Sequence, residues 1–151
     1  MRHGNMGHLR IWLAVVVVAL ALPLGPAIAA TLIVDDNTEP ESCGGNDSDY
    51  ATITAAVADA LSGDRILVRP GTYIEQVTLG ASISRLTLVS RGPGTAVIQA
   101  PARMLGPKAI VHVHGARDVS IEWFIITGPG GGGCDSIRSG LRVDAGGSAT
   151  I

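Results

Sequence analysis

The fold of this chain is decided between Thr52 and Gln99, around the segments ATITAAVADALSG (51–63), DRILVRPGTYIEQVTL (64–79) and RLTLVSRGPGTAVIQ (85–99). The first segment predicts a short amphipathic helix that Thr52 caps and Gly63 ends, because its apolar residues fall on one helical face. These residues are Ile53, Ala56, Val57, Ala60 and Leu61. A helix this short is marginal in isolation, so it must lie on a sheet or on a stack of coils.

From Arg65 onward the apolar residues alternate with a period of two, which indicates strands. Most of the predicted strands are three residues long, and no Asn-Gly or Asp-Gly hairpin turn separates them. Together with a first strand at 31–34, they cover 66–68, 77–79, 86–88, 97–98, 111–113, 119–121, 124–126, 141–143 and 149–151. The strands LTL, VSI and ATI resemble one another and begin at Leu86, Val119 and Ala149, with a spacing near thirty residues.

This spacing predicts a coil-stacking fold. Three short strands per period, each paired with its counterpart one period later, form a parallel β-helix whose strand ends point inward and middle residues outward. We therefore predict an all-β fold for 30–151, a right-handed parallel β-helix (solenoid) with an N-terminal capping helix. Because the last strand would open a further coil, we expect the β-helix to be truncated at its C-terminal end, and self-association through the open coil is the alternative.

Residues 1–29 have the pattern of a secretory signal peptide, with cleavage after Ala29 or Ala30. An uncleaved membrane anchor is the alternative, but the unbroken apolar run 11–22 is shorter than the ~20 residues that span a bilayer. The pattern predicts a secreted or periplasmic protein with no membrane contact after cleavage.

The charge balance excludes one class of partner. Cleavage would remove Arg2 and Arg10 and no acidic residue, so 9 of the 11 basic residues would remain against 13 acidic ones. Nucleic-acid binding requires a basic surface, so we expect no nucleic-acid partner.

The two cysteines, Cys43 and Cys134, are candidates for a disulfide in an oxidising compartment. They lie in the glycine-rich stretches CGG and GGGGC, which are flexible enough to meet, but they belong to different levels of the predicted stack. A disulfide and two free thiols therefore both stay open. Neither cysteine has a histidine or second cysteine at ligand spacing, so we predict no metal site and no cofactor.

The segments 52–79 and 86–99 resemble the N-terminal region of right-handed β-helix proteins of the pectin-lyase-like superfamily. The nearest pattern is that of the pectin methylesterases, whose G-x-Y-x-E signature is matched by Gly71, Tyr73 and Glu75. The resemblance implies a secreted protein that acts on pectin or another acidic glycan. Methylesterases use two aspartates and an arginine of a later coil; no residue here matches them, so no catalytic residue is assigned.

His112 and His114 alternate on the outer face of one predicted strand, and the period places Arg142 and Asp144 at the same outward positions one coil later. Adjacent strands are about 4.8 Å apart, so a contact between His114 and Asp144 is feasible. A His–Asp pair beside an arginine suits acid–base chemistry or substrate binding, whereas the alternative is an exposed cross-strand polar pair. We assign His114, Asp144 and Arg142 as candidate substrate-binding residues.

Other features also have a functional and a structural interpretation. Glu75 either binds substrate in a sugar-binding cleft or satisfies nearby backbone or arginine groups. Trp123 is a sugar-stacking platform if it points outward, and 128–133 is a glycine-rich loop that lacks the phosphate-loop ending. The acidic segment after the first strand contains four candidate calcium ligands, Asp35, Asp36, Asp47 and Asp49. It lacks EF-hand spacing, so we expect a solvated loop rather than a calcium site.

Two function classes follow. The first is a secreted polysaccharide-active enzyme, an esterase or a lyase, whose catalytic coils lie outside this chain. The second is a non-catalytic extracellular or envelope β-helix that binds glycans or serves as a scaffold. Downstream aspartates with an arginine would favour the first class, and plain repeats would favour the second. Polysaccharide is the expected partner.

Overall fold

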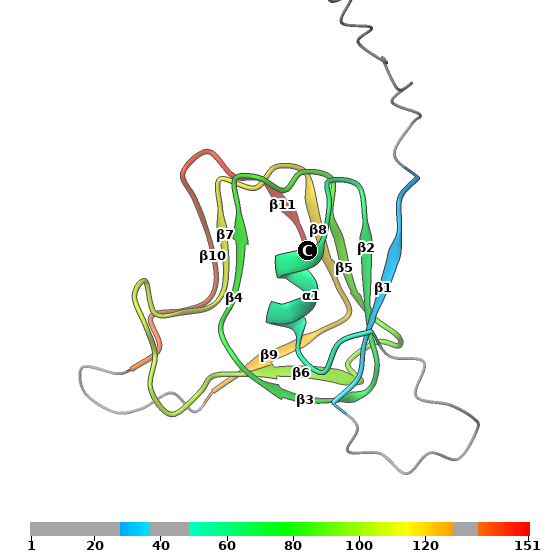
Figure 1. Ribbon diagram of the computed structural model, residues 1–151. Helices are drawn as coiled ribbons and strands as arrows, with labels where there is room; N and C mark the ends of the chain where they lie inside the picture. The colour runs from blue at the N-terminus through cyan, green and yellow to red at the C-terminus, as the bar shows by residue number, and fades with distance from the viewer. Residues whose placement is uncertain (1–27, 37–48, 129–135) are drawn as a thin grey trace, which may run out of the picture.

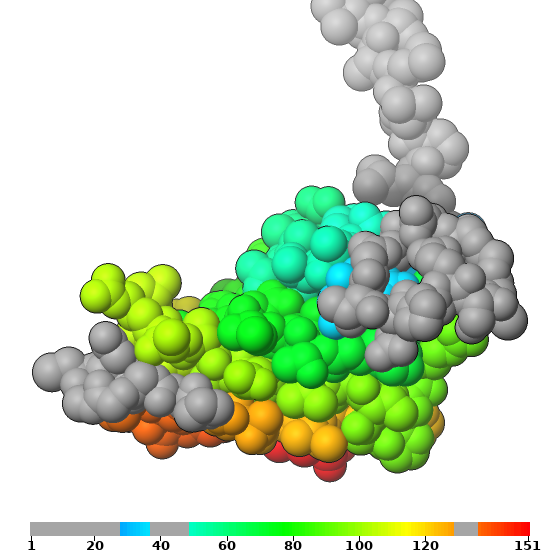
Figure 2. All heavy atoms as spheres, turned by 90° about the horizontal axis from the view of Figure 1, so that it is seen from below, coloured from blue at the N-terminus to red at the C-terminus, as the bar shows by residue number. Residues whose placement is uncertain are grey.

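The computed structural model describes residues 28–36, 49–128 and 136–151. Within these ranges, short parallel strands and one short helix form a right-handed β-helix (Figure 1). The chain winds clockwise as it recedes from the viewer in Figure 1, and Figure 2 shows the first and last coils at opposite faces of the stack. The predicted all-β parallel β-helix is therefore confirmed.

Three parallel sheets form the sides of the coils. Sheet A contains β1 (Thr31–Val34), β2 (Arg65–Val68), β5 (Thr87–Ser90), β8 (Val119–Glu122) and β11 (Ala149–Thr150). Sheet B contains β3 (Gly71–Ile74), β6 (Ala96–Gln99) and β9 (Ile125–Thr127). Sheet C contains β4 (Val77–Gly80), β7 (Ala109–His114) and β10 (Ser139–Asp144). Each strand pairs with its counterpart in the next coil, as predicted.

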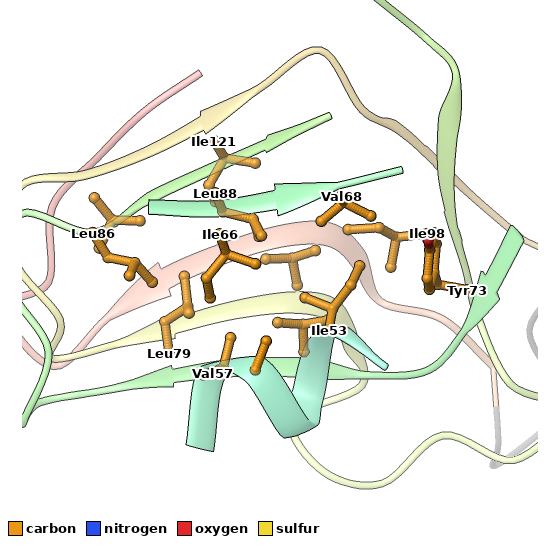
Figure 3. Close-up of a cluster of buried hydrophobic side chains, with 14 of the residues drawn as sticks. Ile53, Val57, Ile66, Val68, Tyr73, Leu79, Leu86, Leu88, Ile98 and Ile121 are labelled. Carbon is orange, nitrogen blue, oxygen red and sulfur yellow. The ribbon is translucent and has the colours of Figure 1, made fainter. Parts of the chain in front are cut away.

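Apolar ladders fill the interior of the coils. Ile66, Leu88 and Ile121 are paired in register across β2, β5 and β8, and their side chains are at most 2% exposed (Figure 3). Tyr73 and Ile98 form a second inward pair on sheet B. Each fully buried aliphatic side chain contributes ~1.5–3 kcal/mol, so the ladders stabilise one register against a slip by a residue.

The helix α1 (Ile53–Asp59) lies over the interior of the first coil and buries Ile53, Ala56 and Val57 against it (Figure 1). The side chain of Thr52 caps the helix as predicted, because its Oγ1 accepts a hydrogen bond from the Ala55 N–H at 3.2 Å. The helix therefore closes the apolar end of the stack that a first coil would otherwise expose.

The helix ends earlier than predicted. It stops at Asp59, whereas Gly63 adopts a φ of +97° in a separate turn, and Leu61 is 67% exposed instead of lying on the buried face. The cause is Asp64, whose carboxylate accepts the backbone N–H groups of Leu61 and Ala30, each at 2.8 Å. These bonds hold the chain in a turn and tie it to the segment before β1.

The strand β3 corrects a second expectation, because the sequence predicts a turn where Gly71–Ile74 is a strand. Pro70 and Gly71 look like turn residues, but parallel pairing with β6 extends the backbone that follows them. Tyr73 points inward at 3% exposure, and its hydroxyl donates to the Arg69 carbonyl at 3.1 Å. The other strands match their predicted bounds to within two residues, and β1 matches them fully.

Several predictions lie outside the described residues: the signal segment up to residue 27, Cys43, Cys134, Asp47 and the glycine run from residue 129. They stay predictions. Within the described ranges, no helix has the length and apolar character needed to cross a membrane.

Candidate functional site

The predicted polar cluster lies on the outer face of sheet C, at the C-terminal ends of β7 and β10. The register is the predicted one: Arg142 pairs with His112 and Asp144 pairs with His114. β7 and β10 run side by side along one edge of the coil in Figure 1, so all four side chains lie on the same outer surface.

Asp144 is the centre of the cluster. Its Oδ1 accepts hydrogen bonds from His112 Nε2 at 2.9 Å and from His114 Nδ1 at 2.7 Å, and its Oδ2 accepts one from Arg142 Nε at 2.6 Å. Because an ionised carboxylate only accepts hydrogen bonds, both of these ring nitrogens carry a hydrogen. The predicted contact between His114 and Asp144 is confirmed, and it extends to a second histidine.

The three donors fix the charge of the carboxylate. Hydrogen bonds from His114, then from His112 and Arg142, hold the pKa of the Asp144 carboxyl well below its usual range. The carboxylate therefore stays ionised at neutral pH. It orients both imidazoles through one ring nitrogen each and leaves the other ring nitrogen of His114 outside this contact.

Burial differs sharply across the cluster. The His112 side chain is 10% exposed, whereas the side chains of His114 and Arg142 are 57% and 46% exposed and that of Asp144 is 29% exposed. The cluster is therefore anchored by one buried imidazole and presents one imidazole and one guanidinium to solvent. A ligand at the surface of sheet C can reach both.

Sequence reasoning placed His112 on the outer face but did not assign it to the site. An outward position on a coil predicts exposure, and the diagonal contact between His112 and Asp144 depends on side-chain rotamers. The signal that was available is the i, i+2 spacing of two histidines on one strand, which places both rings on one face. Their ring centroids are 5.1 Å apart.

Glu75 lies elsewhere, between β3 and β4 at the opposite end of sheet C. Its carboxylate accepts the backbone N–H groups of Ile53 at 2.9 Å and Thr54 at 2.8 Å, and also the Thr54 hydroxyl. This is the structural role that the sequence left open for Glu75. Substrate binding by Glu75 stays a prediction, and substrate would have to compete with these contacts.

The described acids of the first loop also contact the fold itself. Asp35 forms an ion pair with Arg69 at 2.8 Å, Asp36 accepts the Thr72 N–H at 3.0 Å, and Asp49 accepts a backbone N–H of β1 at 2.9 Å. Among the described residues, the only group of three or more candidate metal ligands whose ligand atoms lie together is formed by His112, His114 and Asp144.

Trp123 meets the condition for a stacking platform, because it is 53% exposed at the corner between β8 and β9. Its backbone has a φ of +66°, which is uncommon for a residue with a side chain and turns the chain between the two sheets. The neighbouring Phe124 packs against the core, as expected for an end of the predicted strand 124–126.

Comparison of the chain with protein families, with curated proteins and with solved structures finds no match. The β-helix fold is therefore established by the strand pairing of this chain itself. The G-x-Y-x-E residues have roles in that fold: Gly71 and Tyr73 lie in β3, and Glu75 binds the start of α1.

Proposed function

We propose that this chain belongs to an extracytoplasmic β-helix protein related to the pectin-lyase-like superfamily, and that it binds an acidic polysaccharide on the outer face of sheet C. The observation that carries the proposal is the exposed pair His114 and Arg142, held in place by Asp144. The signal-peptide pattern and the G-x-Y-x-E resemblance support the location and the class of ligand.

The chemistry of the pair suits an acidic sugar. The Arg142 Nε atom donates to Asp144, and the Arg142 side chain is 46% exposed, so its terminal nitrogens can reach a ligand. Such nitrogens bind the carboxylate of a uronic acid with charge-assisted hydrogen bonds. His114 adds an imidazole on the neighbouring strand, which can bind a hydroxyl of the same sugar.

The test is binding of de-esterified polygalacturonate, with a neutral glucan as the comparison ligand, measured by calorimetry at low and high salt. Arg142→Ala should weaken binding about tenfold, the loss of one charged hydrogen bond. Arg117→Ala, which removes an exposed arginine at another corner of the coil, should leave binding unchanged. Equal effects of the two substitutions, or equal affinity for the neutral glucan, would contradict the proposal.

A non-catalytic scaffold is the second candidate, and one observation favours it. Both carboxylate oxygens of Asp144 already have side-chain partners within the chain itself, as expected for a stabilising cross-strand network. A stable wild-type chain that binds neither glycan would support the scaffold.

A further inference from the structure

We propose that His112, His114 and Asp144 form a binding site for one divalent transition-metal ion, with zinc as the reference ion. One ligand atom from each residue lies within 4.8 Å of the others. Two imidazole nitrogens and one carboxylate oxygen form the donor set that zinc and its first-row neighbours use, whereas magnesium and calcium prefer oxygen alone. This site does not depend on the proposed glycan binding.

The geometry needs only a small adjustment to accept the ion. Metal–nitrogen and metal–oxygen bonds of ~2.1 Å in a tetrahedral site place ligand atoms about 3.4 Å apart. The present separations from Asp144 Oδ1 are 2.9 Å to His112 Nε2 and 2.7 Å to His114 Nδ1. Side-chain rotations that widen the first contact by about 0.5 Å and the second by about 0.7 Å would therefore open a position between the three atoms.

Metal binding also requires one proton to move on each ring. Each imidazole now directs an N–H at Asp144, and an ion needs a lone pair at the same nitrogen. That proton moves to the other ring nitrogen or to solvent, and the carboxylate keeps its charge. Two hydrogen bonds are thereby exchanged for three bonds to the ion.

The surroundings fix the ligands and leave access. Parallel pairing of β7 with β10 sets the backbone positions of all three residues, and the buried His112 ring has little freedom to move. Arg142 binds Oδ2 of Asp144 and so orients the carboxylate with Oδ1 toward the rings, as outer-shell partners of metal ligands do. His114 is 57% exposed, so the ion has a path from solvent and keeps open positions for water.

The experiment titrates the full chain with Zn²⁺ by calorimetry and with Co²⁺ by visible absorption, without glycan. The chain has four histidines, and His3 and His8 lie outside the described residues, so the reference protein is the His3→Ala/His8→Ala variant. We expect it to bind one equivalent of zinc and to give the visible band of protein-bound cobalt. His114→Ala and Asp144→Asn on this background should each lower zinc affinity at least tenfold and remove the cobalt band.

Asp118→Asn is the matched control, because it removes an exposed carboxylate from a turn outside the cluster. It should bind zinc like the reference protein. His114 is exposed, so its alanine variant should fold, and circular dichroism checks this; if Asp144→Asn does not fold, His114→Ala decides alone. Unchanged affinity in His114→Ala, or loss of binding in the reference protein, overturns the proposal. Glycan binding measured in EDTA tests the proposed function separately.

Discussion

Glu75 and Asp144 each accept hydrogen bonds from three donors, but the donors differ in kind. Glu75 binds two backbone N–H groups and one hydroxyl at the start of α1. Asp144 binds two imidazoles and one guanidinium on neighbouring strands. The first backbone N–H groups of a helix need an acceptor, and Glu75 supplies it from the first coil. Glu75 therefore joins the capping helix to that coil. Side-chain donors can rotate, change tautomer and exchange one partner for another.

The difference shows that the number of contacts around a carboxylate does not identify a site. The kind of partner and its exposure are more informative: exposed imidazole and guanidinium groups around an ionised oxygen can take up a ligand, whereas a helix start cannot release its cap without cost. On this view Glu75 serves the fold and Asp144 is available for binding. Four predictions test or sharpen this contrast.

The largest effect should come from the backbone beside the cluster rather than from its charges. Gly115 follows His114 with a φ of +77°, and a Cβ there would lie 2.9 Å from the Cβ of Ala81. Gly115→Ala should lower the free energy of unfolding by about 3 kcal/mol, from the left-handed backbone and the steric overlap together. Chemical denaturation of the wild type and the variant measures this difference in unfolding free energy.

Gly146→Ala is the matched control for this substitution. Gly146 has the same φ of +77°, but no atom lies within 4 Å of the added Cβ. It should cost only about 1 kcal/mol, the penalty of the left-handed backbone. Equal losses for the two variants would show that steric contact with Ala81 does not constrain the corner after β7.

Glu75 should give the next largest effect. Glu75→Ala leaves the first N–H groups of α1 without their carboxylate and should lower the free energy of unfolding by about 2 kcal/mol. Glu75→Gln keeps an amide oxygen that still accepts, so it should lose about half as much. If denaturant titration shows no loss of unfolding free energy for either variant, the start of α1 does not depend on Glu75. The statement that Glu75 serves the fold would then be wrong.

The sequence predicted the coils, the strand pairing and the register of the cluster, because alternating apolar residues and turn residues repeat along the chain. That repeat alone places His114 beside Asp144. It does not predict β3, because the Gly71–Ile74 segment resembles a turn until β6 pairs with it. It also misses the early end of α1, where Asp64 binds the Leu61 N–H and also that of Ala30, 34 residues away.

The remaining error in the site has the same physical origin. Strand register fixes which Cβ atoms face each other, but rotamers determine which side-chain atoms meet. His112 therefore looked exposed in sequence and is buried in the structure, with its Nε2 bound to the same oxygen as His114 Nδ1. Period-two patterns contain no information on such diagonal contacts.

Tyr73 should give a smaller, pH-dependent effect. Burial, and after it the charge of Asp36, raises the pKa of the Tyr73 phenol above its usual value of about 10. The fold thus favours the neutral phenol. The contribution of Tyr73 to the free energy of unfolding is therefore complete below pH ~10 and is lost as pH rises toward the folded-state pKa. Tyr73→Phe should lose about 1 kcal/mol at neutral pH and fall less steeply at alkaline pH.

Alkaline denaturation of wild type, Tyr73→Phe and Tyr50→Phe checks this prediction. Tyr50 is the other tyrosine of the chain; its hydroxyl donates to Asp59 at 3.1 Å, and its side chain packs against the core but is only partly buried. Tyr50→Phe should change the alkaline slope less, because the Tyr50 side chain is less completely buried than Tyr73. Equal slopes for wild type and Tyr73→Phe would mean that burial of the phenol is not maintained in solution.

The smallest effect on stability should come from Asp144 itself. Asp144→Asn removes the charge, but its amide oxygen can still accept the hydrogen bond from the buried His112. Water replaces the lost contacts of His114 and Arg142, whose side chains are both about half exposed. The midpoint of unfolding should therefore stay close to that of wild type, while zinc affinity falls at least tenfold. A midpoint lowered as far as in Glu75→Ala would mean that both carboxylates serve the fold. Asp144 would then stabilise β7 against β10, as Glu75 stabilises α1 against the first coil, and the cluster would have no spare donors for a ligand.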